Sequence, residues 1–120
     1  MTNWEDRRKA RAPRFPLLAP ATIEKAFSRG RFQYGRAVNL SRGGLGLEAF
    51  GDLTTGTPVH VTVYLPGQSA LTRAGWVTWA DRPAPTGSGS AGVAFLVALD
   101  GDLVADIASK HSPPGQRLDN

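Results

Sequence analysis

The sequence has no cysteine, and this absence excludes disulfide bonds, thiolate metal sites and cysteine nucleophiles. It also lacks any apolar run near the ~18 residues that a membrane-spanning helix needs. Its first 15 residues are charged, unlike an apolar signal segment. No stretch repeats at the periods of about 20 to 50 residues that mark solenoids or propellers. With 120 residues, the chain has the size of one domain. We expect a single cytoplasmic domain with no membrane partner.

The usual catalytic and metal-binding signatures are absent as well. There is no GxSxG, HExxH or GxxxxGK[ST] sequence. The two histidines, His60 and His111, fall on the polar face of a predicted strand and in a predicted tail. The aspartates Asp100, Asp102 and Asp106 lie at the start of a predicted helix, where the helix dipole favours carboxylates without a metal. We therefore expect neither an enzyme nor a metal or cofactor site.

Basic residues are concentrated at the N-terminal end. The net charge is +4, but the first 43 residues carry ten Lys and Arg against three Asp and Glu, whereas the rest carry four against seven. Pro13, Pro16 and Pro20 follow the first arginines, and each removes a backbone donor. We expect residues 1–20 to form a flexible basic arm through which no helix or central strand runs. Such an arm suits a negatively charged partner, although a solvated basic tail gives the same pattern.

Alternating apolar residues and turn signals predict about six short strands and one helix. The clearest strand lies in PVHVTVYLP, where every second residue is Val or Leu. The segment 82–90 has no large apolar side chain and is typical of a loop, and Asp100 is placed to cap a helix. The predicted strands cover residues 21–27, 32–40, 45–50, 58–65, 71–81 and 91–97, and the helix covers residues 101–110, with Leu103, Val104, Ile107 and Ala108 on one face.

The spacing of these elements predicts the fold class. Because short turns, and not helices, separate the strands, neighbouring strands should pair antiparallel. We expect a mainly β fold, a six-stranded antiparallel barrel with a short C-terminal α-helix. Residues 21–110 would form the barrel and its helix, and residues 111–120 a disordered tail.

Two stretches carry residue types suited to an anionic ligand. In DRRKARAPR, four arginines fall within eight residues, and a guanidinium group grips phosphate bidentately and stacks on flat rings. In NLSRGG, Asn39 and Ser41 share one face of a strand, and Gly43 and Gly44 let the backbone take a positive φ and approach a ligand closely. By local physics alone, this second stretch is typical of an Asx turn. The four arginines are Arg7, Arg8, Arg11 and Arg14.

Together the two stretches resemble the PilZ domain, a bacterial receptor for cyclic di-GMP that is marked by RxxxR and, some 20 to 30 residues later, by [DN]xSxxG. Arg7 and Arg11 supply the RxxxR, and Asn39, Ser41 and Gly44 supply NxSxxG. Downstream, GWVTW and GVAF look like two later strands of the family. The resemblance covers about residues 7 to 97, and it implies a PilZ-like six-stranded barrel with a C-terminal helix.

The resemblance also implies roles for these residues. Arg7 and Arg11 would grip the phosphates and stack against guanine, with Arg8 as an auxiliary contact. Asn39 and Ser41 would hydrogen-bond a guanine edge or the adjacent backbone.

Three further assignments concern the walls of the implied site. Gly44, with Gly43 beside it, would leave room for the base. Trp79 would wall one side of the pocket or lie in the core. One departure concerns Arg14: it is this arginine, and not Arg11, that precedes the apolar residue Phe15, so Arg14 is a further candidate for the phosphate contacts.

The function that follows is a cyclic di-GMP receptor in which the ligand orders the arginine-rich arm over the barrel and changes a surface for a downstream protein partner. No specific DNA partner is expected. Two alternatives stay open: a PilZ-like interaction module that binds no nucleotide, and a general single-stranded nucleic-acid binder, for which Phe32 and Tyr34 would supply stacking rings.

Overall fold

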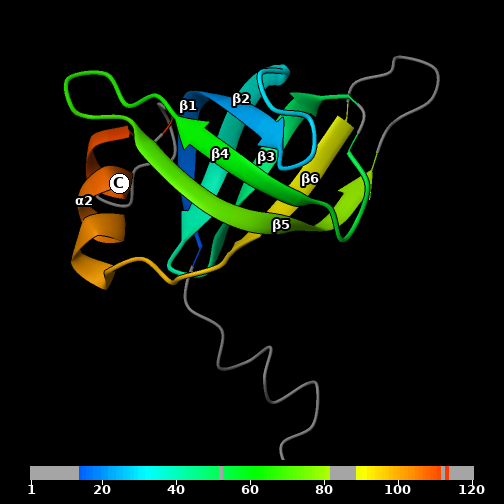
Figure 1. The fold of residues 1–120 in the computed structure, drawn as a ribbon. Helices are drawn as coiled ribbons and strands as arrows, with labels where there is room; N and C mark the ends of the chain where they lie inside the picture. The colour runs from blue at the N-terminus through cyan, green and yellow to red at the C-terminus, as the bar shows by residue number, and fades with distance from the viewer. Residues whose placement is uncertain (1–13, 52, 82–88, 112, 114–120) are drawn as a thin grey trace, which may run out of the picture.

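The computed structural model describes residues 14–51, 53–81, 89–111 and 113. Within them, six strands form a closed antiparallel barrel in the order β1-β2-β3-β6-β5-β4, with the helix α2 packed against β1 and β2 (Figure 1). The expected six-stranded antiparallel barrel with a C-terminal helix is thereby confirmed. The elements are β1 (Phe15–Lys25), β2 (Phe32–Ser41), β3 (Gly44–Phe50), β4 (Pro58–Val63), β5 (Leu71–Asp81), β6 (Gly89–Phe95) and α2 (Gly101–His111).

The barrel interior is filled by one side of each strand. In β4, Val59, Val61 and Val63 are buried, whereas His60 on the opposite face is exposed. This alternation follows the two-residue period of a strand. Each fully buried Val contributes about 1.5 to 3 kcal/mol relative to an exposed one, so the strands are held by the core while their outer faces remain open for other contacts.

Strand β1 begins six residues earlier than the sequence predicts. Leu17, Ala19, Ala21 and Ile23 alternate toward the core, so the expectation that no central strand runs through the prolines is wrong for residues 15–20. The carbonyl oxygen of Pro20 accepts a hydrogen bond from the backbone N–H of Tyr64, at 2.9 Å. Since the N and C=O of one residue point to the same side of an antiparallel strand, the missing N–H of Pro20 faces that side and removes no bond to β2.

Both boundaries of β6 also differ from the predicted ones. Strand β6 begins at Gly89 and ends at Phe95, so Gly89 and Ser90 belong to the sheet and not to the expected loop, whose residues 82–88 lie outside the described part. Residues 96 and 97 lie beyond the end of the strand, although the Leu96 N–H still bonds the Ala74 carbonyl oxygen of β5 at 2.9 Å. The predicted disordered tail lies outside the described residues except for positions 111 and 113.

The helix α2 begins as the sequence predicts. Asp100 Oδ1 accepts the backbone N–H of Asp102 at 2.7 Å, which is an N-cap bond that satisfies one of the free donors of the first turn. Val104, Ile107 and Ala108 are buried against the barrel. The helix continues to His111, one residue into the predicted tail, where the imidazole Nε2 lies 3.1 Å from Gln68 Oε1.

Candidate ligand-binding site

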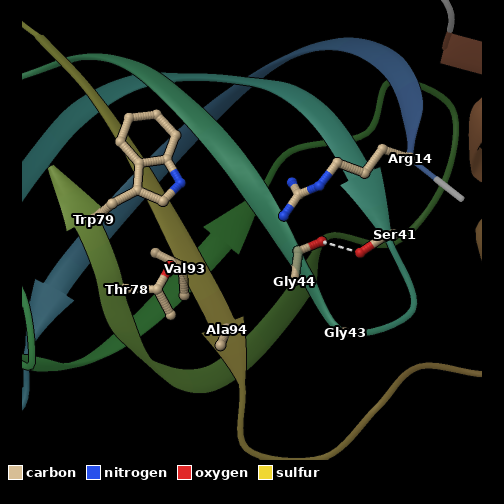
Figure 2. A pocket seen from close by; sticks show the side chains of 8 residues that line it. All are labelled: Arg14, Ser41, Gly43, Gly44, Thr78, Trp79, Val93 and Ala94. Carbon is tan, nitrogen blue, oxygen red and sulfur yellow. Dashed lines mark hydrogen bonds between the residues drawn. The ribbon is translucent and has the colours of Figure 1, made fainter. Parts of the chain in front are cut away.

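The outer face of the barrel carries a pocket of about 420 Å³ beside the turn between β2 and β3 (Figure 2). Ser41 ends β2 and Gly44 begins β3, while the opposite side is formed by β5 and β6. Arg14 stands immediately before β1, and Figure 2 shows it across the pocket from Trp79. The lining residues are Arg14, Ser41, Gly43, Gly44, Thr78, Trp79, Val93 and Ala94.

The floor of this region is made of small residues in register on neighbouring strands. Gly46 of β3 pairs with Gly92 of β6, and two pairs further along Gly44 pairs with Ala94. On the two flanking strands, Asn39 of β2 pairs with Gly46, and Trp79 of β5 pairs with Gly92. Four residues therefore form a row across four strands, which we call the trough. Its middle is Gly46 and Gly92, and its ends are the side chains of Asn39 and Trp79.

Those end side chains lean over the glycines. A Cβ at Gly92 would collide with the indole Nε1 of Trp79, and a Cβ at Gly46 would collide with the amide of Asn39. Because both middle positions lack a Cβ, the amide and the ring can lie flat on the sheet. Trp79 is 45% exposed, so it is a residue of the outer face and not of the core.

Arg14 is tied to the polar end of the trough. Its guanidinium donates a hydrogen bond from Nη1 to Asn39 Oδ1 at 2.8 Å, which leaves the amide NH₂ of Asn39 as a donor. The eight lining residues include no carboxylate, so the positive charge of Arg14 is not neutralised within the pocket. This end suits an anionic or carbonyl-bearing ligand.

A side-chain hydrogen bond spans the turn from Ser41 to Gly44. Ser41 is buried, at 4% exposure, and its hydroxyl donates to the Gly44 carbonyl oxygen at 3.3 Å (Figure 2). Among the described glycines, positive φ angles are confined to Gly30, Gly56 and Gly67, so Gly43 and Gly44 do not use the positive φ that a glycine allows. A Cβ at Gly44 would instead collide with the Val93 carbonyl oxygen, and the glycine is required there by the close approach of β6.

The structure gathers part of the predicted site. Ser41, Gly43, Gly44 and Trp79 line one pocket together with Arg14, and Asn39 reaches it through its bond to Arg14. Arg7, Arg8 and Arg11 lie outside the described residues. The sequence reasoning missed Gly46, Thr78, Gly92, Val93 and Ala94. Two of the family-like segments, GWVTW and GVAF, contain four of these five residues, but nothing in the sequence says that they face Asn39 and Ser41.

The described residues contain no group of three or more His, Asp or Glu side chains that could hold a metal ion. None of their helices is both long and apolar enough to cross a bilayer. The pocket offers groups suited to recognition: a flat indole for stacking, a guanidinium for anions, and amide and hydroxyl groups for hydrogen bonding.

Comparison with known proteins gives a consistent result. The family model described as PilZ domain matches residues 6–109. No curated protein matches the sequence. Among solved structures, the Bacillus subtilis inhibitor of motility (MotI/DgrA) superposes with a TM-score of 0.61 at 13% identity, over 91% of this chain and 54% of that one. The chain thus spans about half the length of that protein.

A second solved structure is similar along nearly its whole length. It is the PilZ domain of CeSA from a cellulose-synthesizing bacterium, with a TM-score of 0.51 at 20% identity, over 82% of this chain and 92% of that one. At these identities the two likenesses establish the fold.

Proposed function

The chain belongs to the PilZ domain family, and from that premise we propose that it is a receptor for cyclic di-GMP. The observation that carries the proposal is the pocket that brings Ser41, Gly44, Trp79 and Arg14 together beside Asn39. A cyclic dinucleotide has flat purines and two phosphate charges, and the pocket offers an indole face at one end and an uncompensated guanidinium at the other.

The proposed binding mode assigns each end of the pocket a part of the ligand. A guanine lies against Trp79 over the Gly46 and Gly92 floor, since these glycines keep that surface flat. Asn39 and Arg14 face the polar edge of the ligand, and Arg7, Arg8 and Arg11 approach the phosphates from the segment that precedes Arg14. Base stacking contributes about 1 to 3 kcal/mol per base, and the arginine contacts add to it.

The same proposal includes a consequence of binding. The ligand neutralises the arginine-rich segment and orders it over the pocket, and the new surface binds a downstream protein. Hydrogen exchange of the amides at residues 7–12 measures this ordering, since it should slow when cyclic di-GMP saturates the protein. If the exchange rates were unchanged at saturation, the proposed ordering of the segment would be wrong and only the proposed binding would stand.

Calorimetry tests the ligand directly. We expect micromolar or tighter binding of cyclic di-GMP, with GMP and a single-stranded oligonucleotide at least about tenfold weaker, which corresponds to about 1.4 kcal/mol. Oligonucleotide binding of equal strength would favour the nucleic-acid alternative. The exposed rings of Phe32 and Tyr34 are the feature that supports this alternative. No binding of any of the three would favour the interaction module without a nucleotide.

The salt dependence of binding separates the two kinds of contact. Ser41→Ala should weaken cyclic di-GMP binding while leaving the slope of affinity against salt concentration unchanged, because a hydroxyl neutralises no phosphate. Arg7→Ala, Arg11→Ala and Arg14→Ala should weaken binding and also reduce the slope. Ser109→Ala, an exposed serine of α2, and Arg73→Ala on β5 are the matched controls, and both should bind like the parent protein.

A further inference from the structure

A second surface of the barrel exposes large apolar side chains that the ligand pocket does not use. Phe27 is 87% exposed, Leu96 and Val97 are each 70% exposed, and Trp76 is 41% exposed. Phe27 lies in the turn after β1, Trp76 on β5, and the other two in the segment after β6. We name these four residues the apolar patch.

A hollow of about 340 Å³ is lined by two residues of this patch, Trp76 and Leu96, and by Ala26, the chain neighbour of Phe27. The turn after β1 and the segment after β6 therefore border the same hollow, with β4 and β5 between them. Figure 1 shows these two strands crossing between that turn and that segment. The hollow shares no lining residue with the pocket of Arg14 and Trp79, and the two are separate surfaces.

The turn that carries Phe27 is also basic. Arg29 and Arg31 are exposed in it, and neither guanidinium makes an ion pair with a described residue. The nearest carboxylate in sequence, that of Glu24, accepts the backbone N–H of Gly30 at 2.6 Å and holds the turn in shape. The apolar patch is therefore bordered by two uncompensated positive charges.

From this combination we propose that the apolar patch docks on an anionic lipid bilayer. Phenylalanine, leucine and tryptophan beside arginine are the side chains that insert at a charged membrane interface, where the rings and aliphatic groups enter the acyl boundary and the cations meet the headgroups. Phe27, Leu96 and Val97 come from turns and connecting segments, so they can enter a bilayer without any strand leaving the sheet. This is adsorption at a surface and requires no membrane-spanning helix.

Charge and side-chain type favour a lipid over the other possible occupants. A second copy of the chain bound through the same patch would bring Arg29 and Arg31 close to their own counterparts, and like charges in an interface oppose association. A single-stranded nucleic acid would meet the same cations, but Leu96 and Val97 have no ring on which a base can stack. A bilayer accommodates both aliphatic and aromatic groups.

Vesicle co-sedimentation of the full chain tests the proposal. We expect binding to phosphatidylcholine vesicles that contain phosphatidylglycerol, roughly tenfold or more weaker binding to pure phosphatidylcholine, and loss of the difference in high salt. Phe27→Glu with Leu96→Glu should abolish binding, and Arg29→Gln with Arg31→Gln should remove the preference for the anionic lipid. Leu18→Glu places the same charge at an exposed leucine of β1 (51% exposed) outside the patch and should bind like the parent protein.

Three results would overturn the proposal. They are equal or absent binding to the two kinds of vesicle, competition by an oligonucleotide at the same concentration as the lipid, and self-association that Phe27→Glu removes. Circular dichroism of each variant verifies the fold, which exposed substitutions should preserve. Calorimetry of the Phe27→Glu variant with cyclic di-GMP keeps this test separate from the proposed receptor function, because the variant should bind the nucleotide normally.

Discussion

At the scale of single residues, the ring of Trp79 depends on the missing side chain of Gly92. A Cβ at position 92 would collide with the indole, and a side-chain ring can move away more readily than a strand can. We expect Gly92→Ala to weaken cyclic di-GMP binding by about tenfold, because the displaced ring no longer stacks on the base, while the melting temperature changes little. Calorimetry on a double-mutant cycle measures this coupling.

The cycle contains its own control. In a Trp79→Ala background no ring remains to be displaced, so Gly92→Ala should have no further effect on the affinity. Equal losses from Gly92→Ala with and without the tryptophan would show that the glycine acts on the ligand directly and would contradict the role assigned to the ring.

The neighbouring glycines Gly43 and Gly44 make a second matched pair. A Cβ at Gly44 would meet the backbone oxygen of Val93, whereas nothing lies within 4 Å of a Cβ at Gly43. We expect Gly44→Ala to lower the free energy of unfolding by about 1 to 3 kcal/mol, as overpacking does, and Gly43→Ala to leave it unchanged or slightly raised. Urea denaturation measures both, and equal effects would rule out the close strand approach as the reason for Gly44.

These residues also show how far the sequence predicts the site. Asn39, Ser41 and Gly44 stand in one short motif, so their proximity follows from local spacing. The contact of Trp79 with Gly92 joins two strands whose register shifts between Val77 and Trp79, and a bulge of that kind has no signature in the sequence. The motif glycine Gly44 does not use the positive φ that glycine allows, because the constraint on it comes from β6, which is distant in sequence.

At the scale of elements, the helix α2 is set by its cap. Asp100→Ala removes the acceptor for the Asp102 N–H and should cost about 1 kcal/mol of stability, whereas Asp100→Asn keeps an acceptor and should restore most of it. Asp106→Ala breaks an exposed ion pair with Lys110 worth only about 0.3 to 0.5 kcal/mol. Urea denaturation should show the largest loss for Asp100→Ala and smaller losses for Asp100→Asn and Asp106→Ala, and a loss as large for Asp106→Ala as for Asp100→Ala would contradict the cap.

Strand β1 shows why element boundaries are harder to predict than element types. Prolines normally end strands because they lack a donor, and this rule placed the start of the strand at Ala21. The burial of Leu17 and Ala19 overrides it, since Pro20 directs its missing N–H away from β2. The alternation that extends the strand was present in the sequence, but the direction of each N–H depends on which strands lie alongside.

At the scale of the whole molecule, the number of strands follows from the sequence but their order does not. Turn signals indicate the number of strands, and neighbours along the chain pair as β1 with β2, β2 with β3, β4 with β5 and β5 with β6. The closure through β3 with β6 and β1 with β4 depends on which strand edges remain after those pairs form. The pocket lies across the β3 and β6 junction, which is why its composition could not be read from any single segment.

Because the barrel is closed, ligand binding should stabilise it as one unit. The pocket is lined from β2, β3, β5 and β6, so a ligand that binds only the folded barrel stabilises all four strands together. At a cyclic di-GMP concentration of 100 times Kd, we expect the free energy of unfolding to rise by about 2.7 kcal/mol. The urea midpoint should increase with an unchanged m-value, and GMP at the same concentration should have little effect. A midpoint that rises together with a lower m-value would mean that part of the barrel unfolds separately, so that the pocket does not report on the whole fold.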